Sequence, residues 1–304
     1  MIYTVTLNPA VDYVVFVPEF QSGDLNKATR DYKFPGGKGI NVSRVLKNLG
    51  TSSINLGFVG GFTGEFIQEK LLQEKLKTNF VPIKAENRIN VKLKSNQETE
   101  INGQGPLIEQ DELAHFMSQL SNLTLEDLVV FSGSIPQGVP KNIYQMCLEM
   151  LEKNHVPFVL DISSSELLEL VAYHPELIKP NHHELAEIFQ TSFSNLEEML
   201  PYGEKLVTMG AKNVLVSMGK EGAVLFNQEG TYLAPGMTGE LINSVGSGDS
   251  MVAGFIQSYW TNHDSVSALK LGVAAGSATA FTEDLASGEE ILNILDRVVV
   301  HKLS

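Results

Sequence analysis

The sequence has few of the features that mark several large classes of protein. One cysteine, Cys147, rules out a disulfide within the chain and suits a reducing compartment. Lysine and arginine total 22 against 36 acidic residues, and this net charge of −14 argues against nucleic acid or an anionic membrane as partner. No apolar run approaches the roughly 18 residues of a membrane span. Residues 1–5 lack the basic-then-apolar order of a signal peptide. These absences predict a cytoplasmic protein.

Two common phosphate-binding motifs are also absent. The chain has no G-x-x-x-x-G-K-[ST], which argues against a Walker-type NTPase. No G-x-G-x-x-G follows the first apolar strand, which argues against a Rossmann dehydrogenase. Any phosphate chemistry must therefore use a different kind of glycine turn.

Apolar strands and amphipathic helices alternate along most of the 304 residues. This alternation predicts an α/β fold, one domain over residues 1–304, with a mostly parallel central sheet covered by helices on both faces. The expected strands are 2–7, 54–59, 128–131, 157–161, 176–178 and 214–217, with an edge hairpin at 223–226 and 231–233. The expected helices are 40–49, 64–76, 109–120, 141–152, 166–172, 182–189, 196–209, 249–260 and 265–280.

A second, smaller sheet is predicted from segments that interrupt this alternation. Residues 88–94 place apolar and polar side chains on opposite faces, and with 98–102 they form a hairpin. Extended runs within 11–34 supply further strands. We expect this small sheet to be a lid that moves when ligand binds. Because exposed strand edges invite pairing, we also expect a homodimer joined through the lids.

One glycine turn, at residues 243–250, opens directly into a predicted helix. Gly246 and Gly248 let the backbone turn tightly, and the unpaired amides of a first helical turn attract anions. Asp249 stands at this turn, where a carboxylate can take a proton from a hydroxyl that attacks a phosphoryl group. The same pattern also fits Asp249 or Ser250 as an ordinary helix N-cap.

A second glycine turn, at residues 35–39, also precedes a helix. Lys38 lies inside it and adds a full charge to a helix start that already favours anions. Lys38 is one of six basic residues between 26 and 47, which form either a solvated face or a patch for an anionic small molecule. Asp12 interrupts an apolar run, where it either caps a turn after Pro9 or accepts hydroxyl hydrogens from a polyol.

Four motifs in order resemble those of the PfkB family, the ribokinase-like carbohydrate kinases, and the resemblance covers essentially the whole chain. They are G-G-K-G-I-N-V at 36–42, K-P-N-x-x-E at 179–184, S-x-G-x-x-G at 217–222 and G-x-G-D at 246–249. Within the family the chain most resembles bacterial 1-phosphofructokinases, and tagatose-6-phosphate kinases are close relatives.

The resemblance implies a role for each matching residue. Asp249 would be the general base, and Gly246, Ser247 and Gly248 the anion hole. Sugar hydroxyls would be held by Asp12, Gly37 and Asn41, with Asn90 nearby on the lid. The sugar's existing phosphate would bind Lys38 and Arg88, and Lys27 less directly. Nucleotide contacts would come from Lys179, Asn181, Glu184, Ser217, Gly219, Lys220, Glu221, Gly222 and Gly248, with Glu184 acting on Mg²⁺ through water.

The implied activity is ATP-dependent conversion of fructose 1-phosphate to fructose 1,6-bisphosphate. Alternatives are a tagatose-6-phosphate kinase and a kinase for an unphosphorylated sugar or nucleoside, against which Lys38 and Arg88 count. A non-catalytic sugar or nucleotide sensor would not need Asp249. We expect His182 and His183 to be surface or packing residues, because adjacent side chains on a helix point apart.

Overall fold

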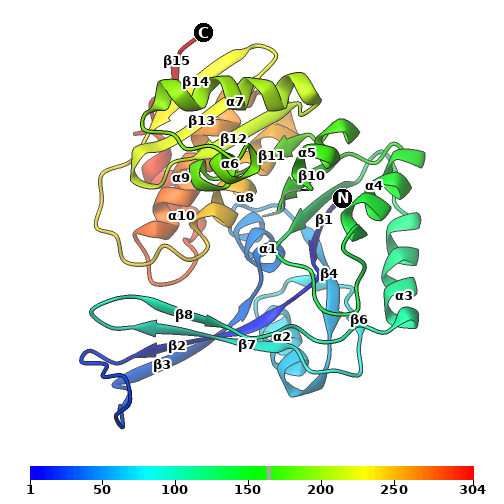
Figure 1. The fold of residues 1–304 in the computed structure, drawn as a ribbon, viewed down its shortest axis with the longest axis vertical. Helices are drawn as coiled ribbons and strands as arrows, with labels where there is room; N and C mark the ends of the chain where they lie inside the picture. Colours follow the sequence, from blue (N-terminus) through cyan, green and yellow to red (C-terminus); the bar gives the residue numbers. More distant parts are fainter. Residues whose placement is uncertain (163–165) are drawn as a thin grey trace.

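One large sheet organises the computed structural model, which describes residues 1–162 and 166–304 (Figure 1). The strand order is β15-β14-β13-β12-β11-β10-β9-β1-β4-β5, with β6 also paired to β4. The parallel strands are β1 Ile2–Thr6, β4 Ser53–Val59, β5 Lys77–Thr78, β6 Val81–Pro82, β9 Leu128–Ser132, β10 Phe158–Asp161, β11 Leu177–Ile178 and β12 Asn213–Ser217. Antiparallel strands at one edge are β13 Gly222–Asn227, β14 Gly230–Pro235 and β15 His301–Lys302. The predicted mostly parallel sheet is confirmed.

Helices cover both faces of this sheet. Along β9, Val129 and Phe131 belong to one buried cluster, whereas Leu128 and Val130 belong to another, as the two-residue period of a strand requires. The first cluster includes residues of α3 Gln110–Ser121, α4 Ile143–Lys153, α5 Leu167–Leu170, α6 His182–Ile188 and α7 Leu196–Met209. The second includes residues of α1 Lys38–Asn48, α8 Ser247–Asn262, α9 Ser265–Ala280 and α10 Gly288–Leu295. Helix α2 Gly61–Gln73 packs in a third, smaller cluster with Val11 and Ile40.

Several elements differ from the predicted ones. The expected helix 166–172 is a single turn, α5, followed by the 3₁₀ turn η1 Val171–Tyr173. Helix α8 begins two residues before the predicted Asp249, so Gly248 lies inside it and Gly246 alone has a left-handed φ, 80°. Helix α10 was not predicted, although Ser287 and Glu290 form the capping box that marks such a start.

The small sheet is separate from the large one, as predicted, and its strand order is β3-β2-β7-β8. Its strands are β2 Ala10–Phe16, β3 Arg30–Gly36, β7 Arg88–Lys94 and β8 Thr99–Asn102. It projects from the main body at the lower left of Figure 1, and we call it the lid sheet. Strands β2 and β7 run parallel, while the other two pairs are antiparallel.

The lid sheet buries the face that its sequence makes polar. On β7, Asn90 and Lys92 are 6% and 7% exposed, whereas the apolar Ile89 is 42% exposed. A polar strand face is buried where it closes over other polar groups, so the lid sheet covers a polar cleft rather than an apolar core.

Among the residues that the structure describes, we find no helix with the length and apolar character needed to cross a bilayer.

Candidate active site

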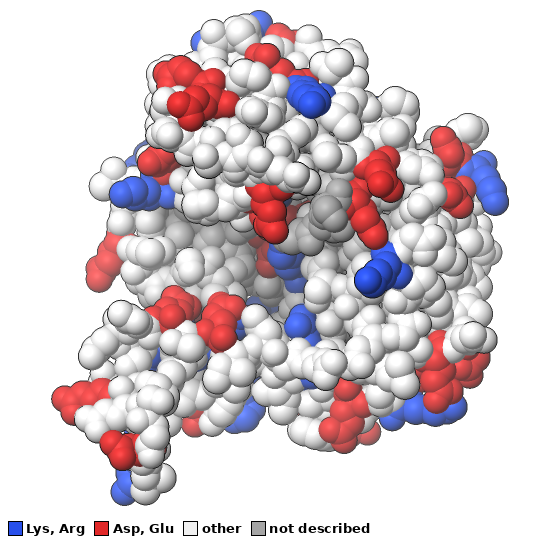
Figure 2. Space-filling view, viewed as in Figure 1, with Lys and Arg blue, Asp and Glu red and all other residues white. Residues whose placement is uncertain are grey.

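A cleft of about 770 Å³ lies between the lid sheet and the carboxyl ends of the parallel strands. Figure 2 shows it as a hollow with lysine and arginine atoms at its centre. Parallel sheets of this kind bind ligands at the carboxyl edge of the strands. The predicted site residues that line the cleft are Asp12, Gly37, Lys38, Asn41, Arg88, Asn90, Lys179, Asn181, Glu184, Ser217, Gly219, Gly246, Gly248 and Asp249.

Asp249 lies in the first turn of α8 and is 6% exposed. Gly246 is the N-cap of this helix, and Asp249 Oδ2 accepts a hydrogen bond from Asn41 Nδ2 at 2.8 Å. The N-cap alternative for Asp249 is therefore wrong. Burial and the nearby Asp161 raise the pKa of Asp249 to about 6, against the opposing effects of Lys38, Asn41 and Lys179. A carboxylate with this pKa is suited to act as a general base near neutral pH.

Two lysines share one buried carboxylate beside Asp249. Asp161, at the end of β10, lies 3.3 Å from Lys179 Nζ and 3.6 Å from Lys38 Nζ through its Oδ1. Burial would raise the pKa of Asp161, but Lys179 and Lys38 together lower it. The pKa of Lys38 is raised, chiefly by Asp161. Lys38 therefore stays charged next to Asp249.

Asp161 was not among the site residues predicted from the sequence. Its signal was available, because it is an acid at the carboxyl end of an apolar strand that the sequence predicts correctly. It lies outside the four motifs that resemble those of the PfkB family. Asp161 is 2% exposed, and its Oδ2 has no hydrogen-bond partner among the described residues.

Other buried polar atoms without a described partner, apart from Gln119 Oε1 on α3, gather at the same edge of the sheet. They are Asn8 Oδ1, Arg88 Nε, Ser132 Oγ, His182 Nδ1 and Ser247 Oγ. Buried polar groups in proteins nearly always have partners, so such a concentration indicates a place where ligands supply them. Ser247 does not line the cleft; it is the first residue of α8, two positions before the predicted start of this helix.

Asp12 is held in place by the lid sheet itself. Its Oδ1 accepts from Asn90 Nδ2 at 2.9 Å, and a Cβ added at Gly36 would come within 2.4 Å of the Asp12 carboxylate. Burial raises the pKa of Asp12, while Asn90, Lys92 and Arg88 act to lower it. Asp12 is therefore no turn cap but an acceptor fixed over the cleft.

Arg88 is bonded to backbone carbonyls. Its Nη2 donates to Asn8 O at 3.2 Å, and its Nη1 lies 3.5 Å from Gly103 O. Burial lowers the pKa of Arg88, and Asp12 opposes this shift. Among the described residues no carboxylate forms a salt bridge with it, so its charge is available to an anion in the cleft.

Asn181 and Glu184 form a capping box at the start of α6. Asn181 Oδ1 accepts from the amides of His183 and Glu184 at 2.9 Å, and Glu184 Oε2 accepts from the Asn181 amide at 2.8 Å. Both side chains are thereby fixed at the cleft. His183 is exposed, as expected for a surface residue. The two histidine side chains do not point apart, however: their ring centroids lie 3.8 Å from each other with an interplanar angle of 39°, and both residues line the cleft.

The third motif is only partly at the cleft. Ser217 and Gly219 line it, whereas Lys220 and Glu221 continue in the 3₁₀ turn η2 Gly219–Glu221 and Gly222 starts β13. A Cβ at Gly222 would lie 2.1 Å from Ala234 O, so this glycine is required for packing. Lys220, Glu221 and Gly222 do not line the cleft.

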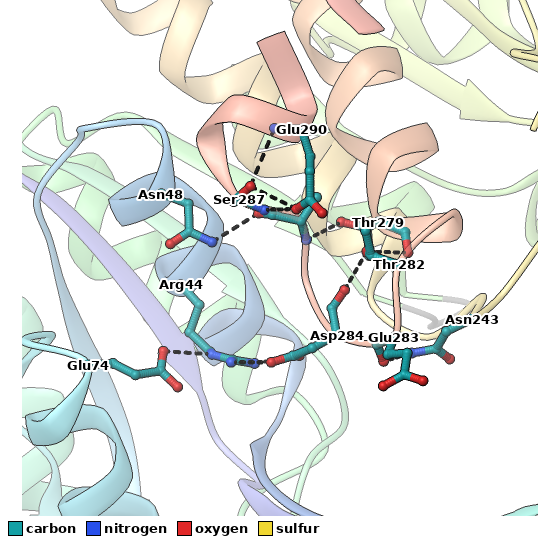
Figure 3. Close-up of polar contacts among 11 residues, drawn as sticks. Arg44, Asn48, Glu74, Asn243, Thr279, Thr282, Glu283, Asp284, Ser287 and Glu290 are labelled. Carbon is teal, nitrogen blue, oxygen red and sulfur yellow. Dashed lines mark hydrogen bonds and ion pairs between the residues drawn. The ribbon is translucent and has the colours of Figure 1, made fainter. Parts of the chain in front are cut away.

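The basic segment between residues 26 and 47 does not gather into one patch. Lys27 is exposed and borders a separate hollow formed by 17–27, away from the cleft. Lys33 pairs with Asp31 at 3.1 Å. Arg44 is clamped between Glu74 at 2.9 Å and Asp284 at 2.7 Å, as Figure 3 shows. Lys38 is the member of this segment that lies deepest in the cleft beside Asp249.

Comparison with known proteins agrees with this geometry. The model of the pfkB family carbohydrate kinases matches residues 5–291. The chain is 50% identical to 1-phosphofructokinase of Bacillus subtilis, with 100% of both chains covered. It is 38% identical to D-tagatose-1-phosphate kinase of Bacillus licheniformis over 94% of both. The structure of phosphofructokinase-2 from Escherichia coli in complex with substrates and products superposes with a TM-score of 0.94 at 28% identity, covering 98% of this chain and 99% of that one. The chain belongs to the PfkB family of carbohydrate kinases.

Proposed function

We propose that this protein transfers the γ-phosphoryl group of ATP to O6 of fructose 1-phosphate, giving fructose 1,6-bisphosphate and ADP. The observation that carries the proposal is Asp249, a buried carboxylate at a glycine-opened helix start, beside two lysines. The relatives named 1-phosphofructokinase support the choice of sugar.

In this proposal Asp249 takes the proton of the attacking sugar hydroxyl. The sugar oxygen bonds to the γ-phosphorus as the bond to the β–γ bridging oxygen breaks, and ADP leaves with that oxygen. The amides that open α8, with Gly246 as N-cap, face the transferring group. Lys38 and Lys179 neutralise the charge of the transferring phosphoryl group, since both form ion pairs with Asp161 next to Asp249. Positioned charge of this kind is the main contribution a protein makes to phosphoryl transfer.

The location of Lys38 supports a role at this reacting end of the cleft. As a matching residue of the PfkB family it was expected to hold the sugar's existing phosphate. Its partners Asp161 and Asp249 instead favour contact with the phosphate in transfer. Arg88, which lies against Asn8, remains an anchor for the existing phosphate. Asp12 would accept hydrogen bonds from the ring hydroxyls, and Asn41 would donate hydrogen bonds to them.

Mg²⁺ would enter with the nucleotide and offset charge on its phosphates. Among the described residues no group of three or more histidine, cysteine, aspartate or glutamate side chains forms a metal cage. Mg²⁺ suits such a site, because it usually keeps several waters and binds through one or two carboxylates and substrate phosphates. Glu184, fixed by its capping box, and the unpartnered Oδ2 of Asp161 are the carboxylate oxygens that fit this role.

The nucleotide would lie at the side of the cleft formed by Lys179, Asn181, Ser217 and Gly219. Asn181 and Ser217 pair as a bridge between two neighbouring strand ends, so they present one continuous edge. This edge would be supported by Lys220, Glu221 and Gly222, which would not contact the nucleotide themselves.

A second candidate substrate is tagatose 1-phosphate, because one relative is a D-tagatose-1-phosphate kinase. Tagatose differs from fructose only at C4, and both sugars carry the phosphate at the same end. The choice between them therefore depends on one ring hydroxyl in reach of groups such as Asp12 and Asn41.

The test is a steady-state assay of ADP release with ATP and each of six acceptors: fructose 1-phosphate, fructose 6-phosphate, tagatose 1-phosphate, tagatose 6-phosphate, fructose and ribose. We expect the highest kcat/KM with fructose 1-phosphate. A higher value with tagatose 1-phosphate would select the second candidate. A higher value with a 6-phosphate or a free sugar would overturn the assignment.

A further inference from the structure

A lysine outside the predicted site residues is buried on the cleft side of the lid sheet. Lys92 lies on β7 and is 7% exposed. Lysine is rarely buried to this degree, because taking an ammonium out of water costs free energy unless a partner offsets it. Lys92 follows Arg88 and Asn90 at intervals of two residues along β7, so all three side chains point from the same face of the strand.

The carboxylate that pairs with Lys92 is only partly withdrawn from water. Lys92 Nζ lies 2.5 Å from Glu100 Oε2, and the side chain of Glu100 is 39% exposed. Glu100 belongs to β8, the edge strand of the lid sheet, directly opposite Lys92. An ion pair with a solvated partner at a sheet edge adds little stability, so burial of Lys92 is poorly explained by this pair alone.

Lys92 stands where two cavities meet. Besides the cleft, a cavity of about 490 Å³ lies under the outer half of the lid sheet. Lys92, Asp12 and Asn41 line both spaces. Asn41 also bonds Asp249, so this junction adjoins the base.

Apart from Arg88, the other lysines and arginines that line the two cavities are paired with carboxylates. Arg44 is held by two carboxylates, Glu74 and Asp284. Lys94 contacts Glu98 and also donates to Asn243 Oδ1 at 3.3 Å. Lys38 and Lys179 share Asp161 at the reacting end. Lys92 has a carboxylate partner as well, but Glu100 is 39% exposed at the sheet edge. Lys92 is therefore the ammonium that can exchange its partner for the far end of a sugar whose reacting hydroxyl lies at Asp249.

We propose that Lys92 binds the phosphate that the sugar already carries and so makes the enzyme prefer a phosphorylated ketose to the free ketose. The inference rests on the proposed function and adds a specificity residue to it. A bound phosphate would compete with Glu100 for the ammonium and would be closed in by the lid sheet, with Arg88 at the base of the same strand as its second cation. The charge on Lys92 would act on binding, whereas the charge on Lys38 would act on transfer.

The test compares Lys92→Met with the wild type in steady-state assays at saturating ATP. We expect KM for fructose 1-phosphate to rise about 10- to 100-fold, the usual worth of a charged hydrogen bond, with kcat and KM for ATP little changed. The kcat/KM for free fructose should stay the same, so the preference for the phosphosugar shrinks by that factor. Lys92→Arg should retain most of the preference for the phosphosugar.

Two further variants separate recognition from a structural role. Lys94→Met removes the next lysine on the same strand face and should leave KM for fructose 1-phosphate unchanged. Glu100→Gln removes the ion pair but keeps the ammonium, and should leave KM unchanged or lower. Binding of fructose 1-phosphate without nucleotide, measured by calorimetry, should weaken in Lys92→Met only.

Three outcomes would overturn the inference. They are an unchanged KM in Lys92→Met, an equal loss for fructose and fructose 1-phosphate, or the same loss in Glu100→Gln. These outcomes are distinct from failure of the proposed function, which would appear as a wild-type enzyme without preference for any ketose phosphate.

Discussion

Asp249 and Asp264 are acidic residues near the starts of two neighbouring helices, each of 16 residues, but their side chains act differently. Asp264 accepts from the amides of Val266 and Ser267 and is the N-cap of α9. Asp249 accepts from Asn41 and faces the cleft. The two positions form a matched pair for a test of catalysis against capping.

Asp249→Ala should lower kcat by about 10²–10⁴, the usual worth of a positioned base, with ATP affinity retained. Asp264→Ala should leave kcat unchanged and destabilise the protein by about 0.5–2 kcal/mol through loss of the cap. Steady-state kinetics and urea unfolding measure both effects. Near-wild-type kcat in Asp249→Ala would contradict the assignment of Asp249 as the general base.

The pKa of Asp249 also predicts how activity depends on pH. Burial raises this pKa from 3.8 to about 6, so the carboxylate in the free enzyme loses its proton only above about pH 6. Below that, kcat/KM for the sugar should fall about tenfold per pH unit, because the base is protonated. A profile measured between pH 5 and pH 8 checks this, and a flat profile down to pH 5 would contradict it.

The raised pKa of Asp249 also affects the stability of the fold. An acid in a salt bridge has a lowered pKa and stabilises the fold as pH rises, whereas Asp249 has the opposite effect. A raised pKa means that folding disfavours the charged carboxylate. Asp249 therefore destabilises the fold progressively as pH rises from about 4 to 6. Asp249→Asn should show a Tm advantage over the wild type that grows across this range and then stays constant.

At the scale of single residues, the sequence predicts groups that belong to local motifs. Asp249, Asn181 and Glu184 were identified in this way, and all three line the cleft. Asp161 was missed because its importance comes from burial beside Lys38 and Lys179. Lys92 was missed because the alternation along β7 does not show which face is buried. A sequence pattern carries no information about which buried charge meets which partner.

At the scale of elements, α1, α2 and the loop after α9 are joined by Arg44 (Figure 3). Its guanidinium donates to Glu74 and, through two nitrogens, to Asp284, and these bonds raise its pKa although burial opposes them. The loop that holds Asp284 also presents Leu285 to Gly246, where an added Cβ would lie 2.6 Å from Leu285 Cδ2. Arg44 therefore supports the glycine turn at the start of α8.

Arg44→Met should destabilise the protein by about 1–3 kcal/mol, because two carboxylates lose a largely buried partner. Arg30→Met is the matched control. Arg30 pairs at 3.5 Å with Glu283, next to Asp284, but both side chains are about half exposed or more. Its loss should cost less than about 1 kcal/mol. Urea unfolding distinguishes the two, and equal effects would show that the Arg44 clamp adds no stability.

The elements themselves were largely predictable. Long helices and buried strands follow from apolar periodicity, and the lid sheet follows from alternation along β7. The prediction failed where periodicity is short, as in β5, β6 and β15, which are two residues long each. It also could not tell that the polar face of β7 is the buried one, because that depends on what the face covers.

At the scale of the whole molecule, the lid sheet leaves apolar side chains on its outer face. Ile89 and Ile101 are 42% and 61% exposed, and both edge strands, β3 and β8, are free to pair. We expect a homodimer joined through these surfaces. Light scattering at micromolar concentration should give twice the mass of 33.3 kDa.

Ile101→Lys should shift that equilibrium toward the monomer, because it places a charge in the expected interface. Leu125→Lys is the control, since Leu125 is 65% exposed and lies outside the lid sheet. A wild-type mass of one chain would reject the dimer. Unchanged hydrogen exchange at residues 88–102 on adding fructose 1-phosphate would reject the moving lid.

The lid sheet and the α1 turn are drawn from the first 102 residues, whereas Lys179, Asn181, Ser217 and Asp249 come from the last 126 or so positions of the chain. Most groups that would recognise the sugar and most groups that would transfer the phosphate are thus encoded in separate stretches, with Lys38 as the exception. Recombination between relatives within residues 103–178 would exchange one set and keep the other. Such a crossover allows a gene to acquire new sugar-binding groups while it inherits Lys179, Asn181, Ser217 and Asp249, as long as both parents carry a lysine at position 38.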